Sequence, residues 1–416
     1  MTPVKPILTI DGARICLVFE HSLTHYTRLR TEIAALQRAG ATISLLTARE
    51  RPGEPIPGIE VTHAPLSSVT TLVPPSSVRY RLLRIADNLL RRPMRYVVDR
   101  LGAPFLAAAR RRALEDLADR TDIFWVIDYP SLPAVIEVAE KRSVPVIYET
   151  VDLVPEYHYR GERHRLRTLA SERTLIPRVA GFITACDSYA DYYTERYGDI
   201  LKRRPLVRDN MPEHLAADIR PTAQPLRVLF LGSLMFDRPV TELIEAMALT
   251  SAPVMLTIQG KNFLGEAPAR RIAELGLGER VRIVGPCPPE KVVETAATYD
   301  LGVVALKGEN ENERRAATSK LFTYMAAGLA ILGSELPGIA RVVSEHGNGL
   351  LVDDMTPSAW AQGLERIAAL TPAQVDEMKR RSLDAAHGYS FENQRPAFIA
   401  EFARALDGAG RTEDRT

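Results

Sequence analysis

The chain has 416 residues, of which 46% are hydrophobic and 25% charged, and its formal net charge is +1. This length and composition are typical of a folded protein with about two domains. A net charge near zero gives no general attraction for nucleic acid, and no recognition module is visible, so we expect no nucleic-acid partner. No apolar run approaches about 18 residues and no signal-peptide pattern opens the chain, which predicts a cytoplasmic protein. Cys16, Cys186 and Cys287 are widely spaced, which favours reduced thiols over a metal site.

Short apolar strands alternate with helical stretches through the first half of the chain. A helix predicted at about 29–38 ends on Gly40, a typical C-terminal signal. Continuously apolar strands separated by helices indicate a parallel sheet that is covered on both faces. The predicted strands are 15–19, 43–47, 123–127, 144–148, 182–185 and 206–208.

The same pattern restarts after residues 214–225, which contain two prolines and lose the periodicity of a helix or strand. We therefore predict an N-terminal Rossmann-like domain over 1–213, a linker at 214–225 and a second Rossmann-like domain over 226–390. A C-terminal helix is predicted at 391–407, with a frayed tail at 408–416. The strands predicted for the second domain are 228–231, 254–258, 281–284, 301–306, 330–332 and 350–352.

Residues 318–328 lie between two of these strands and predict the helix of a parallel crossover. Thr318 or Ser319 would cap its start, and Gly328 would end it in a left-handed conformation. Lys320 in the first turn opposes the helix dipole, which is unfavourable unless an anion binds there. The N-terminus of such a helix is a common phosphate site, so we predict that Lys320 binds phosphate. The alternative is a solvated lysine at a helix start.

A second candidate for phosphate binding follows the first strand of the second domain. Gly232 and Ser233 would let the backbone approach a ligand closely, and Arg238 could hold two phosphate oxygens. Together with Lys320 on a neighbouring strand end, Arg238 could neutralise a diphosphate. Taken alone, Arg238 would more often be a surface residue.

These segments resemble family 4 glycosyltransferases of the GT-B fold. The motif Ser-Lys-Leu-Phe-Thr-Tyr-Met-Ala-Ala-Gly-Leu (319–329) is the most informative. Other matching segments of the second domain are 230–234 with Arg238, 256–260, 281–286, 299–304 and 347–352. In the first domain the matching segments are 148–156, 172–176, 182–188 and 207–212.

The resemblance implies a GT-B fold whose second domain binds an NDP-sugar donor. Arg238 and Lys320 would then neutralise the departing diphosphate, without a metal ion or other cofactor. Family members usually retain the anomeric configuration. The remaining donor-site residues that the resemblance implies are Gly232, Ser233, Gly285, Pro286, Leu321, Thr323, Gly338 and Ile339.

The chain departs from the family pattern at several positions. A pair of glutamates would fall at Arg315 and Thr323, and the second usually holds the ribose hydroxyls. One of Glu309, Glu311 and Glu313 could replace the first. A histidine near the donor sugar corresponds to Val151, and Glu20 to Tyr26 replaces a glycine-rich acceptor loop. A catalytically silent GT-B protein that binds a nucleotide or partner is therefore one alternative. An NDP-sugar epimerase is another, disfavoured because the motifs follow the transferases.

Four first-domain residues near predicted strand ends are candidates for the interdomain cleft, namely His21, His25, Glu149 and Asp152. A polar group there could orient an acceptor hydroxyl or stabilise an oxocarbenium-like centre. For each histidine, a loop or core role is the alternative. Asp128 also ends a strand, where a turn-forming role is expected.

Residues 79–112 form a basic segment with ten arginines against only Asp87 and Asp99. Leu82, Ile85 and Leu89 recur at helical spacing among them. An apolar stripe beside an arginine face is typical of a helix on an anionic membrane surface, which would suit a lipid-linked acceptor. The alternative is a helix that packs its stripe on the sheet. A glycan and a small molecule are the other acceptors that we consider.

Overall fold

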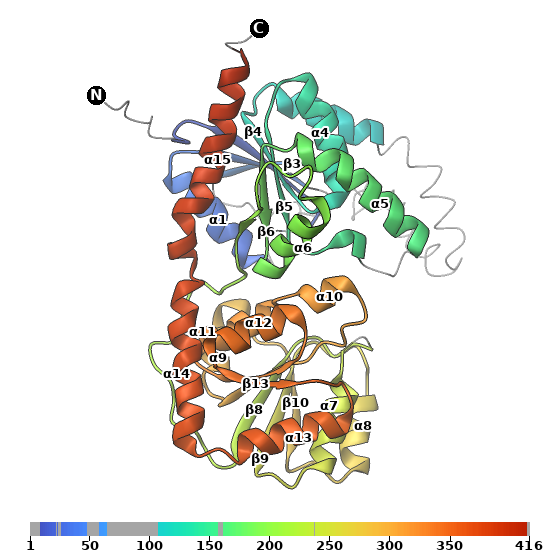
Figure 1. Ribbon diagram of the computed structural model, residues 1–416, viewed down its shortest axis with the longest axis vertical. Helices are drawn as coiled ribbons and strands as arrows, with labels where there is room; N and C mark the ends of the chain where they lie inside the picture. The colour runs from blue at the N-terminus through green and yellow to red at the C-terminus, as the bar shows by residue number, and fades with distance from the viewer. Residues whose placement is uncertain are drawn as a thin grey trace, which may run out of the picture.

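The computed structural model describes residues 9–21, 23, 26–47, 58–64, 107–156, 161–236 and 238–413. It contains two stacked α/β domains, with one of the last two helices of the chain running beside each domain (Figure 1). The GT-B architecture predicted from the sequence is confirmed by this arrangement of two parallel sheets. Within the described residues, no helix has the length and apolar character needed to cross a membrane.

The first domain has a seven-stranded sheet in the order β3-β2-β1-β4-β5-β6-β7, with parallel pairing throughout. Its strands are β1 (Arg14–Phe19), β2 (Thr42–Thr47), β3 (Ile59–His63), β4 (Ile123–Ile127), β5 (Val146–Thr150), β6 (Gly181–Thr184) and β7 (Leu206–Val207). Its helices are α1 (Thr27–Arg38), α4 (Leu132–Lys141), α5 (Glu162–Leu175) and α6 (Asp187–Tyr197), together with residues 107–118. Short 3-10 turns occupy Tyr129–Ser131, Val154–Glu156 and Ile176–Arg178.

The second domain has a six-stranded parallel sheet in the order β10-β9-β8-β11-β12-β13. Its strands are β8 (Leu226–Leu231), β9 (Val254–Gln259), β10 (Val281–Val284), β11 (Leu301–Val304), β12 (Ala330–Ser334) and β13 (Gly349–Val352). Its helices are α7 (Val240–Leu249), α8 (Ala267–Glu274), α9 (Val292–Ala296), α10 (Glu311–Arg315), α11 (Ser319–Ala326), α12 (Pro337–His346), α13 (Pro357–Ala368) and α14 (Pro372–Gly388). A 3-10 turn at Pro289–Lys291 precedes α9.

Strand β4 shows why the strands of the first domain are continuously apolar. Phe124 and Val126 belong to the core on one face of the sheet, and Ile123, Trp125 and Ile127 belong to the core on the other face. Because successive side chains of a strand point to opposite faces, both sets must be apolar when helices cover both faces. The edge strand β3 was not predicted, because its five residues are only half-buried and lack the continuous apolar run by which the other strands were identified.

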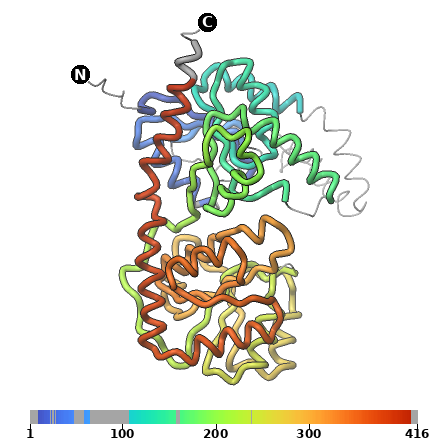
Figure 2. The backbone as a smooth tube through the Cα atoms, in the orientation of Figure 1, coloured from blue at the N-terminus to red at the C-terminus, as the bar shows by residue number. Residues whose placement is uncertain are grey.

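Helix α15 (Phe391–Glu413) continues from α14 and returns along the first domain (Figure 2). Phe398 and Phe402 pack against the Trp125 ring, with centroid distances of 5.9 and 5.5 Å. Residues 408–413 are helical, which corrects the prediction of a frayed tail from 408 onward. Once the apolar face of α15 is anchored on the sheet, adding further residues to the helix requires no new nucleation.

Candidate functional site

A cavity of about 510 Å³, here called cavity A, lies between the two domains. The second domain contributes the segments that follow β8, β9 and β10 and the first turn of α11. The first domain contributes Arg28 and Thr31 from α1, and Arg208 follows β7. Cavity A therefore lies at the carboxyl ends of parallel strands, where open α/β sheets bind their ligands.

The first turn of α11 forms one wall of cavity A. Thr318 is the N-cap residue, but its side chain makes no capping hydrogen bond and its buried Oγ1 has no hydrogen-bond partner. Lys320 and Thr323 line the cavity, and the Thr323 hydroxyl donates a hydrogen bond of 2.8 Å to Ser319 O. The Leu321 side chain instead lies in the hydrophobic core.

The loop after β8 forms the floor of cavity A. Gly232 has φ of 154°, in a region that favours glycine, and its N–H donates to Gln259 O at 3.0 Å. A Cβ added at Gly260 would lie 1.9 Å from Gly232 O, so the loops after β8 and β9 are in close contact. Gly232 and Ser233, which were predicted to lie near a bound ligand, both line the cavity.

Arg238 lies in a different place from Lys320. The bridge between Leu234 and Asn262 carries the chain away from cavity A before α7 begins. Arg238 lines a separate hollow of about 540 Å³, together with the 88% exposed Phe236 and with Lys307. The structure thus does not bring the two predicted phosphate-binding cations into one cavity.

The other predicted donor-site residues also separate. Pro286 lines cavity A, whereas the neighbouring Gly285 is exposed and does not. Ile339 is fully buried in the core, and a Cβ added at Gly338 would lie 2.3 Å from Arg315 O. Gly338 and Ile339 therefore serve the packing of α12 against the end of α10.

On the first-domain side, the wall of cavity A rests on a buried ionic network. Glu149 is fully buried, and its carboxylate accepts hydrogen bonds from the Arg28 guanidinium and from Trp125 Nε1. Arg28 also donates to Glu32 at 3.0 Å. Burial, reinforced by repulsion from Glu149, raises the pKa of Glu32 to about 7. Glu149 thus holds Arg28 in place from inside the first domain and does not line the cavity, whereas we predicted from the sequence that Glu149 itself faces the cleft.

Buried polar atoms without a hydrogen-bond partner gather around cavity A. The described residues contain ten such side-chain atoms, and five of them belong to Arg28, Glu32, Arg208, Gln259 and Thr318, which line this cavity or adjoin its walls. Arg208 Nε lies 3.0 Å from Glu32 Oε1 in an ion pair, so four of these five atoms have no partner. Buried polar groups are normally satisfied, so this concentration is typical of a site where a polar ligand provides the missing partners. Arg28, Arg208 and Gln259 were not predicted as site residues, although the Arg28–Glu32 pair, spaced by four residues in α1, is visible in the sequence.

Asp152 lies at the contact between the domains. Its Oδ1 accepts a hydrogen bond of 3.3 Å from Asn312 Nδ2, and Asn312 Oδ1 accepts bonds of 2.7 Å from Leu153 N and Tyr189 OH. Asp128 accepts from Val151 N, and burial together with the nearby Asp152 charge raises the pKa of Asp128 to about 7. Helix α10 therefore reaches into the first domain beside the predicted catalytic carboxylate.

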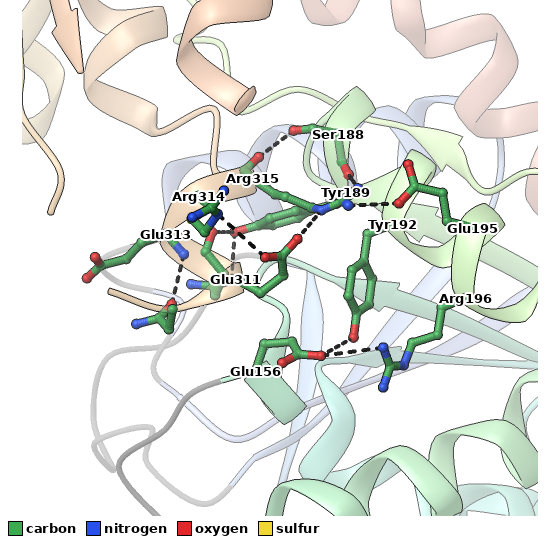
Figure 3. Close-up of polar contacts among 12 residues, drawn as sticks. Glu156, Ser188, Tyr189, Tyr192, Glu195, Arg196, Glu311, Glu313, Arg314 and Arg315 are labelled. Atoms are coloured by element: carbon green, nitrogen blue, oxygen red, sulfur yellow. Dashed lines mark hydrogen bonds and ion pairs between the residues drawn. The ribbon is translucent and has the colours of Figure 1, made fainter. Parts of the chain in front are cut away.

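A second interdomain cavity of about 550 Å³, here called cavity B, lies between α6 and α10 (Figure 3). Arg315 stands where the sequence comparison expected a glutamate, and it donates to Glu195 at 2.7 Å and to Glu311 at 2.5 Å. On the first-domain side, Glu156 accepts hydrogen bonds from Arg165 and Tyr192. The α6 residues of this cavity belong to no motif, so they could not be predicted from the sequence.

His21, one of the two candidate histidines, lines neither cavity. His21 is exposed, and its ring stacks on Tyr26 and contacts the edge of Phe19, with centroid distances of 6.2 and 5.6 Å. His25 and residues 79–106 of the basic segment lie outside the described residues, while 107–112 begin a helix.

Comparisons with known proteins agree with this architecture. Residues 26–207 match the family "Glycosyl transferase 4-like domain", and residues 225–369 match "Glycosyl transferases group 1". The chain is also similar to the D-inositol 3-phosphate glycosyltransferase of Corynebacterium urealyticum, with 32% identity over 133 residues. That match spans 32% of this chain and 30% of the relative, so it covers about a third of the relative's length.

Solved structures show the same fold at low sequence identity. Sucrose-phosphate synthase from Thermosynechococcus elongatus superposes with a TM-score of 0.68 at 17% identity, covering 95% of this chain and 100% of that one. The Anabaena protein HepE in complex with UDP gives a TM-score of 0.63 at 14% identity, also covering 95% and 100%.

Proposed function

The chain belongs to the family 4-like glycosyltransferases of the GT-B fold, and we propose that it transfers a sugar from an NDP-sugar bound in cavity A to an acceptor hydroxyl. One observation carries this proposal. Lys320 and the open N-terminus of α11 share an interdomain cavity with a concentration of unpartnered buried polar atoms. A nucleoside diphosphate has the charge and the hydrogen-bonding groups that such walls would satisfy.

Each wall of cavity A has a distinct role in this proposal. The diphosphate lies at the start of α11, where Lys320 and the helix N–H groups neutralise the charge that develops on the leaving group. Pro286 and Cys287 offer a surface for the base. Arg28, held by Glu149, closes the cavity from the first domain. Arg238 reaches the diphosphate only if the loop after β8 moves.

Asp152 is the first-domain carboxylate that we propose to act near the transferred sugar. Its bond to Asn312 places it at the domain interface rather than inside the first domain. A carboxylate in that position can stabilise an oxocarbenium-like centre or orient an acceptor hydroxyl. Retention of configuration, and transfer without a metal ion or other cofactor, follow from the family resemblance. NMR of the product anomer and activity after chelation would test these two points.

The first test is calorimetric titration with UDP, GDP, ADP and dTDP. We expect one nucleotide to bind, and we expect Lys320→Ala to weaken it about tenfold or more, because a charge-assisted hydrogen bond contributes about 1.5–3 kcal/mol. Lys141→Ala is the matched control, since Lys141 is an exposed lysine of α4 that pairs only with Glu137 among the described residues. Absence of binding by all four nucleotides would favour the catalytically silent alternative.

Product analysis separates transfer from epimerisation. Incubation of the bound NDP-sugar with candidate acceptors should release the nucleoside diphosphate and form a glycoside, whereas an epimerase would return a different NDP-sugar. A lipid-linked acceptor at the membrane surface is one possibility, motivated by the arginines of residues 79–112. Equal recovery in the supernatant with anionic and neutral vesicles at low salt would remove that possibility.

A further inference from the structure

Cavity B has polar walls that come from both domains. Helix α6 and the Val154–Glu156 turn provide the first-domain wall, and α10 with the residues that precede it provides the second-domain wall. Figure 3 shows Tyr192, Glu195 and Arg196 on α6 facing Glu311, Arg314 and Arg315 on α10. A molecule bound here would therefore contact both domains at once.

The carboxylates deepest in these walls are already engaged by arginines. Arg165 donates to both oxygens of Glu156, at 2.7 and 3.2 Å. Burial would raise the pKa of Glu156, but hydrogen bonds from Arg165 and Tyr192 outweigh it and lower that pKa. Glu195 and Glu311 both accept hydrogen bonds from Arg315. The negative charge of these three carboxylates is thus largely matched within the protein. The exposed Glu309 is the fourth carboxylate of the cavity, whose walls also contain four arginines.

Two arginines of cavity B remain loosely engaged. Arg196 Nη1 lies 3.9 Å from Glu156 Oε1, and Arg314 Nε lies 3.7 Å from Glu311 Oε2, both beyond hydrogen-bond distance. The Arg196 guanidinium also lies 5.6 Å from the centroid of the Tyr192 ring and interacts with the Tyr197 hydroxyl. Their side chains are 35% and 55% exposed, so both can reach a ligand in the cavity.

We propose that cavity B is an anion-binding subsite in which Arg196 from the first domain and Arg314 from the second hold a phosphate or carboxylate group of the acceptor. Guanidinium groups bind such oxyanions through paired N–H donors. This subsite rests on the proposed glycosyl transfer, since it assigns a charged group to the acceptor. It also makes acceptor binding a contact that bridges the domains.

The chain places this subsite within reach of cavity A. Arg315 lines cavity B and Ser319 lines cavity A, and they are four positions apart in one segment. Even fully extended, four residues span about 14 Å. An acceptor anchored in cavity B by its charged group can therefore present a hydroxyl toward a donor in cavity A.

Three probes that share a sugar ring test this subsite, namely glucose 6-phosphate, glucuronate and glucose. They are titrated into Lys320→Ala protein, where the competing anion site at α11 is weakened. We expect at least one anionic probe to bind about tenfold more tightly than glucose, and about tenfold more weakly when Arg196→Gln and Arg314→Gln are added. If glucose 6-phosphate binds more tightly than glucuronate, the acceptor group in cavity B is a phosphate; if glucuronate binds more tightly, it is a carboxylate.

Arg380→Gln is the matched control for Arg314→Gln. Arg380 lies on α14, has the same 55% side-chain exposure, and is paired loosely with Glu377 at a spacing of three residues. Equal binding of all three probes, no detectable binding of either anion at millimolar concentration, or full binding in the double arginine variant overturns the subsite. These outcomes leave the nucleotide titration of cavity A unchanged, so the failure of one proposal is distinguishable from the failure of the other.

Discussion

Glu172 provides a quantitative test of how burial controls stability in the first domain. Its side chain is fully buried, and the hydroxyls of Tyr148, Tyr193 and Tyr197 donate to its carboxyl oxygens at 3.4, 3.1 and 3.1 Å. Burial raises the pKa of Glu172 from 4.5 to about 7, although the three hydroxyls act in the opposite direction. We therefore expect the folded protein to retain a proton on Glu172 in mildly acidic solution.

This shift fixes the sign and size of a pH effect. Between the unfolded pKa of 4.5 and the folded pKa of about 7, the folded state binds more protons than the unfolded state. Glu172 consequently contributes its full stability below the unfolded pKa and loses it as the pH rises through the folded pKa. A shift of this size corresponds to about 3 kcal/mol of unfolding free energy.

Glu172→Gln removes the titrating group and keeps the shape of the side chain. We expect the variant to become more stable relative to the wild type by about 3 kcal/mol between about pH 5 and about pH 8. Urea unfolding followed by tryptophan fluorescence measures this difference, because Trp125 lies in the first-domain core. Parallel pH profiles of the variant and the wild type in this range would refute the reasoning.

Glu156→Gln is a control of opposite sign. Hydrogen bonds from Arg165 and Tyr192 exceed the effect of burial and lower the pKa of Glu156. Its contribution to stability is therefore present above the unfolded pKa and lost as the pH falls through the folded pKa. Glu156→Gln should destabilise the protein at neutral pH, with a smaller effect in acid. If both variants changed the unfolding free energy in the same direction with pH, the hydrogen-bonding and charged partners of each carboxyl group would not determine the sign of its pH effect.

Three further substitutions test contacts of the fold. Asn312→Ala should weaken domain docking by about 2 kcal/mol, because Leu153 N–H loses its acceptor; limited proteolysis between the domains measures this, and unchanged cleavage would contradict it. Gly302→Ala should lower the unfolding free energy by about 1–3 kcal/mol, because its Cβ would lie 2.3 Å from the Tyr324 ring. An unaltered thermal transition would oppose this. Thr371→Ala should cost about 1 kcal/mol by removing the capping box of α14, measured by urea unfolding, and an unchanged midpoint would argue against it.

The fold was predictable because its strongest signals are local. Buried parallel strands such as β4 are apolar at every position, and helices between them have their own periodicity. Strand β3 lacked this signal because it lies at the edge of the sheet and is half-buried. Likewise, the extent of α15 depends on its packing against Trp125 in the other half of the chain, which the sequence around residue 408 does not encode.

The candidate site was predictable only where one segment forms it. The α11 motif placed Lys320 and Thr323 beside a cavity, because helix and strand order determine where that N-terminus lies. The sequence could not show that Glu149 supports Arg28 from behind, since this depends on how α1 packs on β5. The sequence also could not show that Arg238 lies outside cavity A, because the path of the chain there depends on the bridge between Leu234 and Asn262.

Arg315 illustrates how the structure gives a departure from the family pattern a physical meaning. The sequence identified only that an arginine stands where relatives have a glutamate. In the structure, that arginine donates to Glu195 of the first domain and to Glu311 of its own helix. A glutamate at position 315 would face these two carboxylates and be repelled by both. The arginine is therefore matched to acidic partners on α6 and α10, and the segment that joins the two cavities helps hold the domains together.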